Sequence, residues 1–236
     1  MAGIAAEAGM TLEPDAHADG LYWARLREKR WPATVNLAPG RSVYGELILK
    51  GDGKEYRVWD PYRSKLSAAL LKGLEPMPVT KGARVLYLGA STGTTVSHVS
   101  DIVGDKGLVF AVEVAHRVAR ELLENVVRYR RNVVPIIEDA RNVDAYRVIF
   151  GQVDLVYCDI AQPDQTPIAL ANCRRYLKRG HLLLVVKARS IDSTRDPSQI
   201  VSEEAEKVRL EGLEVLQTME LDPFDKDHGM IFALRR

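Results

Sequence analysis

Residues 85–95 read VLYLGASTGTT, an aliphatic run that breaks into a turn of small residues. A strand, turn and helix start of this kind brings a ligand against backbone N–H groups where no Cβ intrudes. Glu113 ends the next apolar run, where a carboxylate can accept hydrogen bonds from both ribose hydroxyls of an adenosine-type ligand. The pattern predicts a cofactor site, although an ordinary strand-turn-helix connection would use the same glycines.

The spacing of the glycines narrows the choice of cofactor. The turn is G-x-S-x-G-T, so Ser91 occupies the position where a dinucleotide-binding fold needs bare backbone beside a pyrophosphate. S-adenosyl-L-methionine carries no phosphate and fits this turn better than NAD. Contacts are expected from the turn and from the ends of the strands that follow. The predicted cofactor-binding residues are Gly89, Ala90, Ser91, Gly93, Thr94, Thr95, Glu113, Val114, Asp139, Ala140, Asp159 and Gln162.

Apolar strands alternate with helical segments through residues 61–236, which predicts right-handed crossovers and a doubly wound α/β sheet. The last two strands have only a short link, so they should pair as a hairpin and make the final strand antiparallel. A seven-stranded sheet with a reversed last strand is the Rossmann-like arrangement of class I S-adenosylmethionine-dependent methyltransferases. The strands are predicted at residues 84–88, 108–113, 133–137, 153–159, 181–187, 214–220 and 230–234.

The part of the chain before residue 61 has a different hydrophobic pattern, without the alternation of apolar strands and helical segments. Residues 21–26, 43–49 and 55–59 are short alternating runs separated by Pro-Gly and Gly-Asp-Gly turns. We therefore predict a small N-terminal β domain at residues 21–60, followed by the methyltransferase domain at residues 61–236. Residues 1–20 are expected to form a loose tail.

The composition excludes several classes of protein. No apolar run approaches the roughly 18 residues that a membrane span needs, and the start of the chain lacks the pattern of a signal peptide. A cytoplasmic protein without a membrane partner is expected. Cys158 and Cys173 lack metal-type or disulfide spacing, so both are interpreted as packing residues and no metal site is expected.

Charge is segregated along a chain whose net charge is only +1. Residues 21–65 hold ten Lys or Arg against five Asp or Glu, and residues 170–195 hold seven bases and one acid. Such segregation can build a positive face for phosphates, and it can equally be a set of solvated surfaces.

Asp159 and Lys187 end neighbouring predicted strands. Both follow wholly apolar runs, where an unpaired charge is costly unless it reaches an open site. Ligands in such sheets bind beyond the carboxyl ends of the strands, so the pair is expected in a catalytic site. The alternative is a buried Asp–Lys salt bridge with a purely structural role.

Four segments together resemble the fibrillarin family in its shorter archaeal form. They are YRVWDPYRSKL at residues 56–66, LYLGASTGTTVSHVSDIVG at 86–104, DIAQPDQ at 159–165 and VVKARSID at 185–192. The resemblance runs from about residue 44 to the C-terminus, and the chain has no glycine- and arginine-rich extension. It implies S-adenosylmethionine-dependent 2′-O-methylation of ribose in rRNA, and possible action on tRNA, directed by a box C/D guide RNA.

The resemblance also implies roles for residues and partners. Lys65, Asp159 and Lys187 match the lysine-aspartate-lysine core of ribose methyltransferases, and His228 matches a fourth catalytic position. Arg63, Lys65, Arg189 and Arg195 are candidates for RNA contact. The implied partners are guide RNA, target RNA, a Nop-family scaffold protein and a kink-turn-binding protein of ribosomal type.

Two other functions fit parts of the sequence. A small-molecule methyltransferase would share the segment from Gly89 to Glu113 but would not need a basic rim or the Lys65-Asp159-Lys187 set. A noncatalytic scaffold subunit would be expected to lose Asp159 or Lys187, and this chain keeps both.

Overall fold

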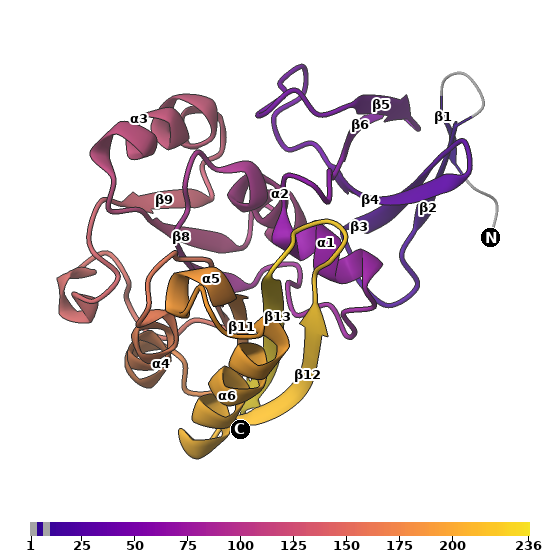
Figure 1. Cartoon of the computed structure of the whole chain (residues 1–236). Helices are drawn as coiled ribbons and strands as arrows, with labels where there is room; N and C mark the ends of the chain where they lie inside the picture. Colours follow the sequence, from indigo (N-terminus) through magenta and orange to yellow (C-terminus); the bar gives the residue numbers. More distant parts are fainter. Residues whose placement is uncertain (1–3, 7–9) are drawn as a thin grey trace.

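The computed structural model describes residues 4–6 and 10–236, which form a small antiparallel sheet and a larger mixed sheet covered by helices (Figure 1). The small sheet, drawn in indigo, lies beside α1 and α2 of the larger unit. Within these described ranges, no helix combines the length and the apolar character needed to cross a bilayer.

The larger sheet has seven strands in the order β12-β13-β11-β10-β7-β8-β9. β13 runs antiparallel to both of its neighbours and the other pairings between β7 and β11 are parallel, so the predicted class I methyltransferase fold is confirmed. Strand order reverses between β7 and β10, which opens a ligand crevice at their carboxyl ends. The strands are β7 (Arg84–Leu88), β8 (Leu108–Val112), β9 (Val133–Ile136), β10 (Leu155–Cys158), β11 (Gly180–Lys187), β12 (Glu214–Glu220) and β13 (His228–Arg235).

Alternate residues of the strands point to opposite faces, and each face carries its own helices. α1, α2 and α3 contribute apolar residues to the core on one face, whereas α4 and α6 cover the other. At the start of α6, the Asp196 carboxylate accepts from the Ser198 N–H at 2.8 Å and Pro197 stands in the first turn, as is typical of a capped helix. The helices are α1 (Lys65–Leu71), α2 (Thr94–Val103), α3 (His116–Asn125), α4 (Gln165–Tyr176), α5 (Ala188–Ile191) and α6 (Pro197–Leu210), with short 3₁₀ turns η2 (Val127–Tyr129) and η3 (Val143–Ala145).

The N-terminal sheet has six strands in the order β1-β2-β3-β4-β6-β5, all paired antiparallel. One of its faces packs its own small core around Leu12, Ala24 and Tyr56. Leu21 and Trp23 join the core of the methyltransferase domain instead. The strands are β1 (Ile4–Ala6), β2 (Met10–Pro14), β3 (Leu21–Leu26), β4 (Lys29–Val35), β5 (Ile48–Gly51) and β6 (Lys54–Val58).

Two predictions for this part of the chain are wrong. β1 and β2 belong to the sheet, so the described part of residues 1–20 is not a loose tail, and Leu12 on β2 is fully buried. The predicted strand at 43–49 is mostly a loop, because the Glu46 carboxylate accepts hydrogen bonds from the Val43 and Tyr44 N–H groups at 3.0 and 2.8 Å. Side-chain acceptors of this kind compete with strand pairing.

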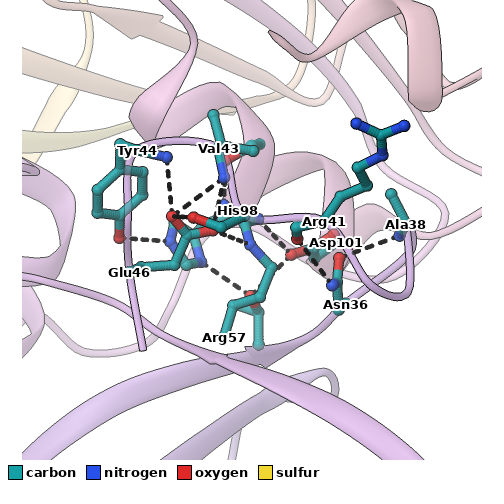
Figure 2. A network of polar contacts seen from close by, with 12 residues as sticks. Asn36, Ala38, Arg41, Val43, Tyr44, Glu46, Arg57, His98 and Asp101 are labelled. Carbon is teal, nitrogen blue, oxygen red and sulfur yellow. Dashed lines mark hydrogen bonds and ion pairs between the residues drawn. The ribbon is translucent and has the colours of Figure 1, made fainter. Parts of the chain in front are cut away.

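A buried polar network joins the N-terminal sheet to α2 (Figure 2). The Arg57 guanidinium on β6 contacts Glu46 at 2.6 Å, Asp101 of α2 at 2.7 Å and the Ser97 hydroxyl at 2.8 Å. The charged side chains of this cluster have no solvent exposure. Because a buried guanidinium needs acceptors for its donors, the network holds the N-terminal sheet in one position against α2.

His98 extends the network through a chain of hydrogen bonds whose donors and acceptors can be assigned. The Thr34 hydroxyl donates to Asp101 Oδ2 at 2.9 Å, so its oxygen accepts from His98 Nδ1 at 2.8 Å. His98 Nε2 is then an acceptor for the Tyr44 hydroxyl at 2.8 Å. His98 is neutral in this arrangement, and burial together with the charges of Arg57 and Arg130 holds its pKa well below 6.5.

Candidate active site

Two lysines converge on one carboxylate at the carboxyl edge of the larger sheet. Lys187 Nζ lies 2.8 Å from Asp159 Oδ1, and Lys65 Nζ lies 3.3 Å from the same oxygen. The side chains of Lys187 and Asp159 are only 16% and 13% exposed. The structure therefore brings together the three predicted catalytic residues.

Different elements deliver these three side chains. Asp159 follows the end of β10 and its N–H continues the ladder to Leu88 O of β7 at 2.9 Å. Lys187 is the last residue of β11, and Lys65 is the first residue of α1. The Ser64 hydroxyl lies 2.9 Å from that of Thr95, which ties the start of α1 to the start of α2.

Gln165 fixes the backbone at Lys187. Its Oε1 accepts from the Lys187 N–H at 3.0 Å, and its Nε2 donates to the Gln162 carbonyl at 3.0 Å. The side chain is fully buried. Gln165 is thus a positioning residue that the sequence did not single out, because a glutamine at a helix start carries no distinctive signal.

The fourth predicted catalytic residue, His228, reaches the cluster through another carboxylate. Asp225 Oδ1 lies 2.9 Å from His228 Nδ1, and Asp225 Oδ2 lies 3.5 Å from Lys65 Nζ. His228 also stands opposite Lys187 in the β11–β13 register. Burial raises the pKa of Asp225, but the hydrogen bond from His228 and the Lys65 charge outweigh it and hold that pKa below its ordinary value.

A cavity of about 440 Å³ opens beside the cluster, a volume suited to a small-molecule ligand. Asp159 and Lys187 belong to its lining, and seven further predicted cofactor-binding residues take part. These seven are Gly89, Ser91, Glu113, Val114, Asp139, Ala140 and Gln162.

The turn after β7 shows why glycine and serine stand where they do. Gly89 has a φ of +83°, and a Cβ there would lie 2.7 Å from the Asp159 carbonyl oxygen. Glu113 Oε2 accepts from the Ser91 N–H at 2.9 Å, and its Oε1 accepts from the Ala115 N–H at 2.9 Å. Each carboxylate oxygen keeps a second lone pair, so Glu113 is oriented and can still accept from two ribose hydroxyls.

The other predicted cofactor-binding residues, Ala90, Gly93, Thr94 and Thr95, do not line this cavity. Gly93 serves packing, because a Cβ there would lie 2.4 Å from a methyl group of Val126. Thr95 is buried, and Thr94 is the first residue of α2. Their roles toward a cofactor stay predictions.

The predicted RNA-binding arginines are exposed around the site. Arg189 lies 3.1 Å from Asp227, and Arg195 forms an ion pair with Glu203. Arg63 makes no ion pair with the residues that the structure describes, and its guanidinium carbon lies 5.8 Å from the centre of the Tyr44 ring. RNA contact by these residues stays a prediction.

Several lining residues were missed from the sequence. Four come from the loops after β9 and β10, one ends β8 and one lies in α4. They are Val112, Glu138, Arg141, Ile160, Ala161 and Ile168. Both cysteines are buried as predicted, and burial raises the pKa of Cys158 to about 12, which keeps its thiol protonated.

Comparison with known proteins identifies the family. The fibrillarin family model matches residues 12–236, which include β3 to β6 of the small sheet, the cavity and the Lys65-Asp159-Lys187 cluster. The chain belongs to the fibrillarin family. Its larger sheet is the fold of the S-adenosylmethionine-dependent methyltransferases.

Three similar proteins show how far the fibrillarin likeness extends. A fibrillarin-like rRNA/tRNA 2′-O-methyltransferase from Aeropyrum pernix is 51% identical over 205 residues, which are 86% of this chain and 88% of the relative. The crystal structure of Aeropyrum pernix fibrillarin with natively bound S-adenosyl-L-methionine has a TM-score of 0.87 at 46% identity, covering 98% of this chain and 99% of that one. The fibrillarin of a fibrillarin/Nop5p complex has a TM-score of 0.78 at 40% identity, covering 87% and 94%.

Proposed function

We propose that this fibrillarin-family chain transfers a methyl group from S-adenosyl-L-methionine to a ribose 2′-hydroxyl of rRNA or tRNA. The observation that carries the proposal is the Lys65-Asp159-Lys187 cluster, of which Asp159 and Lys187 line the cavity and lie 2.8 Å apart, Nζ to Oδ1. A methyltransferase for small molecules would not require two lysines around one carboxylate. The Aeropyrum pernix relative named for this reaction is 51% identical.

The residues of the cavity fit the cofactor. Glu113 is oriented by two backbone N–H groups and would bind the ribose, while Asp139 and Ala140 line the part of the cavity expected to take adenine. Gly89 also lines the cavity, and it lets the turn pack closely on the Asp159 backbone. When bound, the sulfonium supplies an electrophilic methyl group.

The surroundings of Lys187 suit a base for a weakly acidic hydroxyl. Its Nζ lies 2.8 Å from Asp159 Oδ1 and donates to the Asp159 carbonyl oxygen at 2.9 Å. In the amine form one N–H donates to the Asp159 carbonyl oxygen, and the lone pair can take the 2′-hydroxyl proton. Once Lys187 takes that proton on Nζ, Asp159 stabilises the resulting ammonium group.

We further propose that a box C/D guide RNA selects the target and that a Nop-family scaffold and a kink-turn-binding protein deliver the enzyme. A net charge of +1 supports a need for partners, because affinity for a duplex grows with the number of phosphates neutralised. Arg189 and Arg195 already have carboxylate partners within the chain. The fibrillarin/Nop5p complex is a precedent from a relative.

A reconstitution experiment tests both parts. The chain, labelled cofactor, guide RNA and target are mixed with and without the two partner proteins, and the product is digested with alkali. A 2′-O-methyl group blocks cleavage at its own linkage, whereas a methylated base does not. We expect one guide-paired nucleotide to become resistant, with much less product when the scaffold is omitted.

Two outcomes would overturn these proposals separately. Methyl transfer to bases alone would disprove the ribose assignment. Equal rates with and without scaffold and guide would show that the enzyme finds its RNA unaided. The Asp159→Asn variant is the control for methylation by a contaminating enzyme.

A further inference from the structure

Arg141 connects two loops that both line the cavity. It follows β9, and its guanidinium contacts Asp164 of the loop after β10 through NH2 at 2.8 Å and Nε at 3.0 Å. The same group lies 3.3 Å from Gln162 Oε1 and 3.2 Å from Asp139 Oδ2. One side chain therefore binds acceptor groups of three residues, from the loop after β9 and the loop after β10.

Asp164 departs from its usual local role to make this contact. It is the N-cap residue of α4, a position where an aspartate carboxylate normally accepts from the backbone N–H groups of the first turn. Its side chain makes no such capping bond and pairs with Arg141 instead. A helix that gives up its cap for a contact elsewhere indicates a functional demand on that contact.

The contacts of Arg141 also orient Asp139. Asp139 Oδ1 accepts from the Arg141 backbone N–H at 2.8 Å, while Oδ2 faces the guanidinium at 3.2 Å. Without the guanidinium, Asp139 would keep only its backbone hydrogen bond and Asp164 would lose its cationic partner. Arg141 therefore neutralises this edge and sets the direction of the Asp139 acceptor.

We propose that Arg141 is the positioning residue that sets the preference of the cavity for adenine, by holding Asp139 and Gln162 in place to recognise the exocyclic amino group. This inference rests on the cofactor assignment in the proposed function and does not depend on the RNA substrate. A carboxylate can accept from the amino group of adenine but cannot donate to the carbonyl oxygen that replaces it in hypoxanthine.

The test compares two ligands that differ at this one group. Calorimetry on the full chain measures the affinity for S-adenosyl-L-homocysteine and for S-inosyl-L-homocysteine. We expect the wild-type chain to prefer the adenosyl compound by at least about tenfold, since an unmatched polar group in the site is costly. Arg141→Ala should bring that ratio close to one and weaken adenosyl binding by about tenfold.

Two further variants separate positioning from general stability. Arg141→Lys keeps the charge but loses the planar fork, so it should recover only part of the preference. Arg175→Ala is the matched control, because Arg175 pairs with Asp144 at 3.3 Å on the neighbouring exposed surface and lines no part of the cavity. It should leave both affinities unchanged.

The possible results are distinguishable. A wild-type preference that persists in Arg141→Ala would overturn the proposal, even if both ligands bound more weakly, because equal weakening indicates only a structural ion pair. If the wild-type chain bound neither ligand, the cofactor assignment and this inference would fail together. A failure of RNA methylation alone would contradict the proposed RNA substrate. It would not affect the inference on Arg141, which the two ligand affinities test.

Discussion

Lys187 Nζ is held by two oxygens of the same residue, the Asp159 carboxylate at 2.8 Å and the Asp159 backbone carbonyl at 2.9 Å. The two residues end adjacent parallel strands, so the contact depends on the register of the sheet as well as on the side chains. The hydrogen bond to the carbonyl oxygen and the nearby carboxylate charge fix the position of Lys187 Nζ, as a positioned base requires.

Removal of either member of this pair should abolish methyl transfer. We expect Lys187→Met and Asp159→Asn to lower the single-turnover rate by at least about a hundredfold, the scale of a lost general base. Affinity for S-adenosyl-L-homocysteine should stay within a few fold, because Glu113 and the turn after β7 are unchanged. Lys65→Ala should lower the single-turnover rate to a similar extent. Near-normal rates in the reconstituted particle would disprove the mechanism.

Glu113→Ala should weaken cofactor binding by about tenfold or more, because each hydrogen bond to a charged acceptor contributes about 1.5–3 kcal/mol. The variant also releases the Ser91 and Ala115 N–H groups that the carboxylate now binds. Calorimetry measures the effect, and Glu121→Gln on the exposed face of α3 is the control. Unchanged affinity in Glu113→Ala would remove this residue from the site.

His228→Ala should cause a partial loss of activity. The imidazole reaches the cluster only through Asp225, which lies 2.9 Å from it and 3.5 Å from Lys65. Its removal leaves the Lys187–Asp159 contact intact, so we expect a reduction of about tenfold in the single-turnover rate, at the low end for a supporting group. A loss as complete as that of Lys187→Met would instead assign the proton transfer to His228.

The buried network between the N-terminal sheet and α2 should make the free energy of unfolding depend on pH. His98 has a folded-state pKa well below 6.5 because it is buried, so the unfolded chain binds more protons as the pH falls through 6.5. Burial raises the pKa of Glu46, but the Arg57 charge and the backbone N–H groups of Val43 and Tyr44 lower it by more. The net result is a pKa below 4.5. Its contribution is present above pH 4.5 and is lost as the pH falls below that value.

We therefore expect the free energy of unfolding to fall from pH 7 to pH 4, as measured by urea denaturation. His98→Gln should flatten the part of the curve just below pH 6.5, and Glu46→Gln the part below pH 4.5. Asp101→Ala leaves Arg57 paired with Glu46 but takes away the carboxylate that the buried Arg130 contacts at 3.1 Å, so it should cost about 3–5 kcal/mol at neutral pH. A stability that rose on acidification would contradict this account of the network.

The strands of the larger sheet and the turn at Gly89 could be predicted because their signals are local. A β-branched and aliphatic run favours a buried strand, and a glycine or serine marks the point where the backbone takes a positive φ, as Gly89 and Ser91 do. The strand order placed Asp159 and Lys187 on one edge, and the structure brings them within 2.8 Å.

Other features depended on contacts between distant parts of the chain. The segment before residue 21 was predicted as a tail because nothing local shows that β2 pairs with β3. The loop at 43–47 replaced a predicted strand because Glu46 turns inward to Arg57, a residue whose burial no local pattern reveals. Arg141 and Gln165 looked like ordinary polar residues until the loops after β9 and β10 were placed beside each other.

The sequence by itself determined the fold class and the turn after β7, since propensity and glycine conformation act within a few residues, and its resemblance to the fibrillarin family supplied Lys65, Asp159 and Lys187 as catalytic candidates. Only the tertiary structure decided which charges are neutralised within the chain and which face the cavity. Arg189 was expected to meet RNA and pairs with Asp227, whereas Arg141 was overlooked and spans the cavity edge. Coulomb energies depend on separation in space and on burial, and neither quantity can be read from the order of residues.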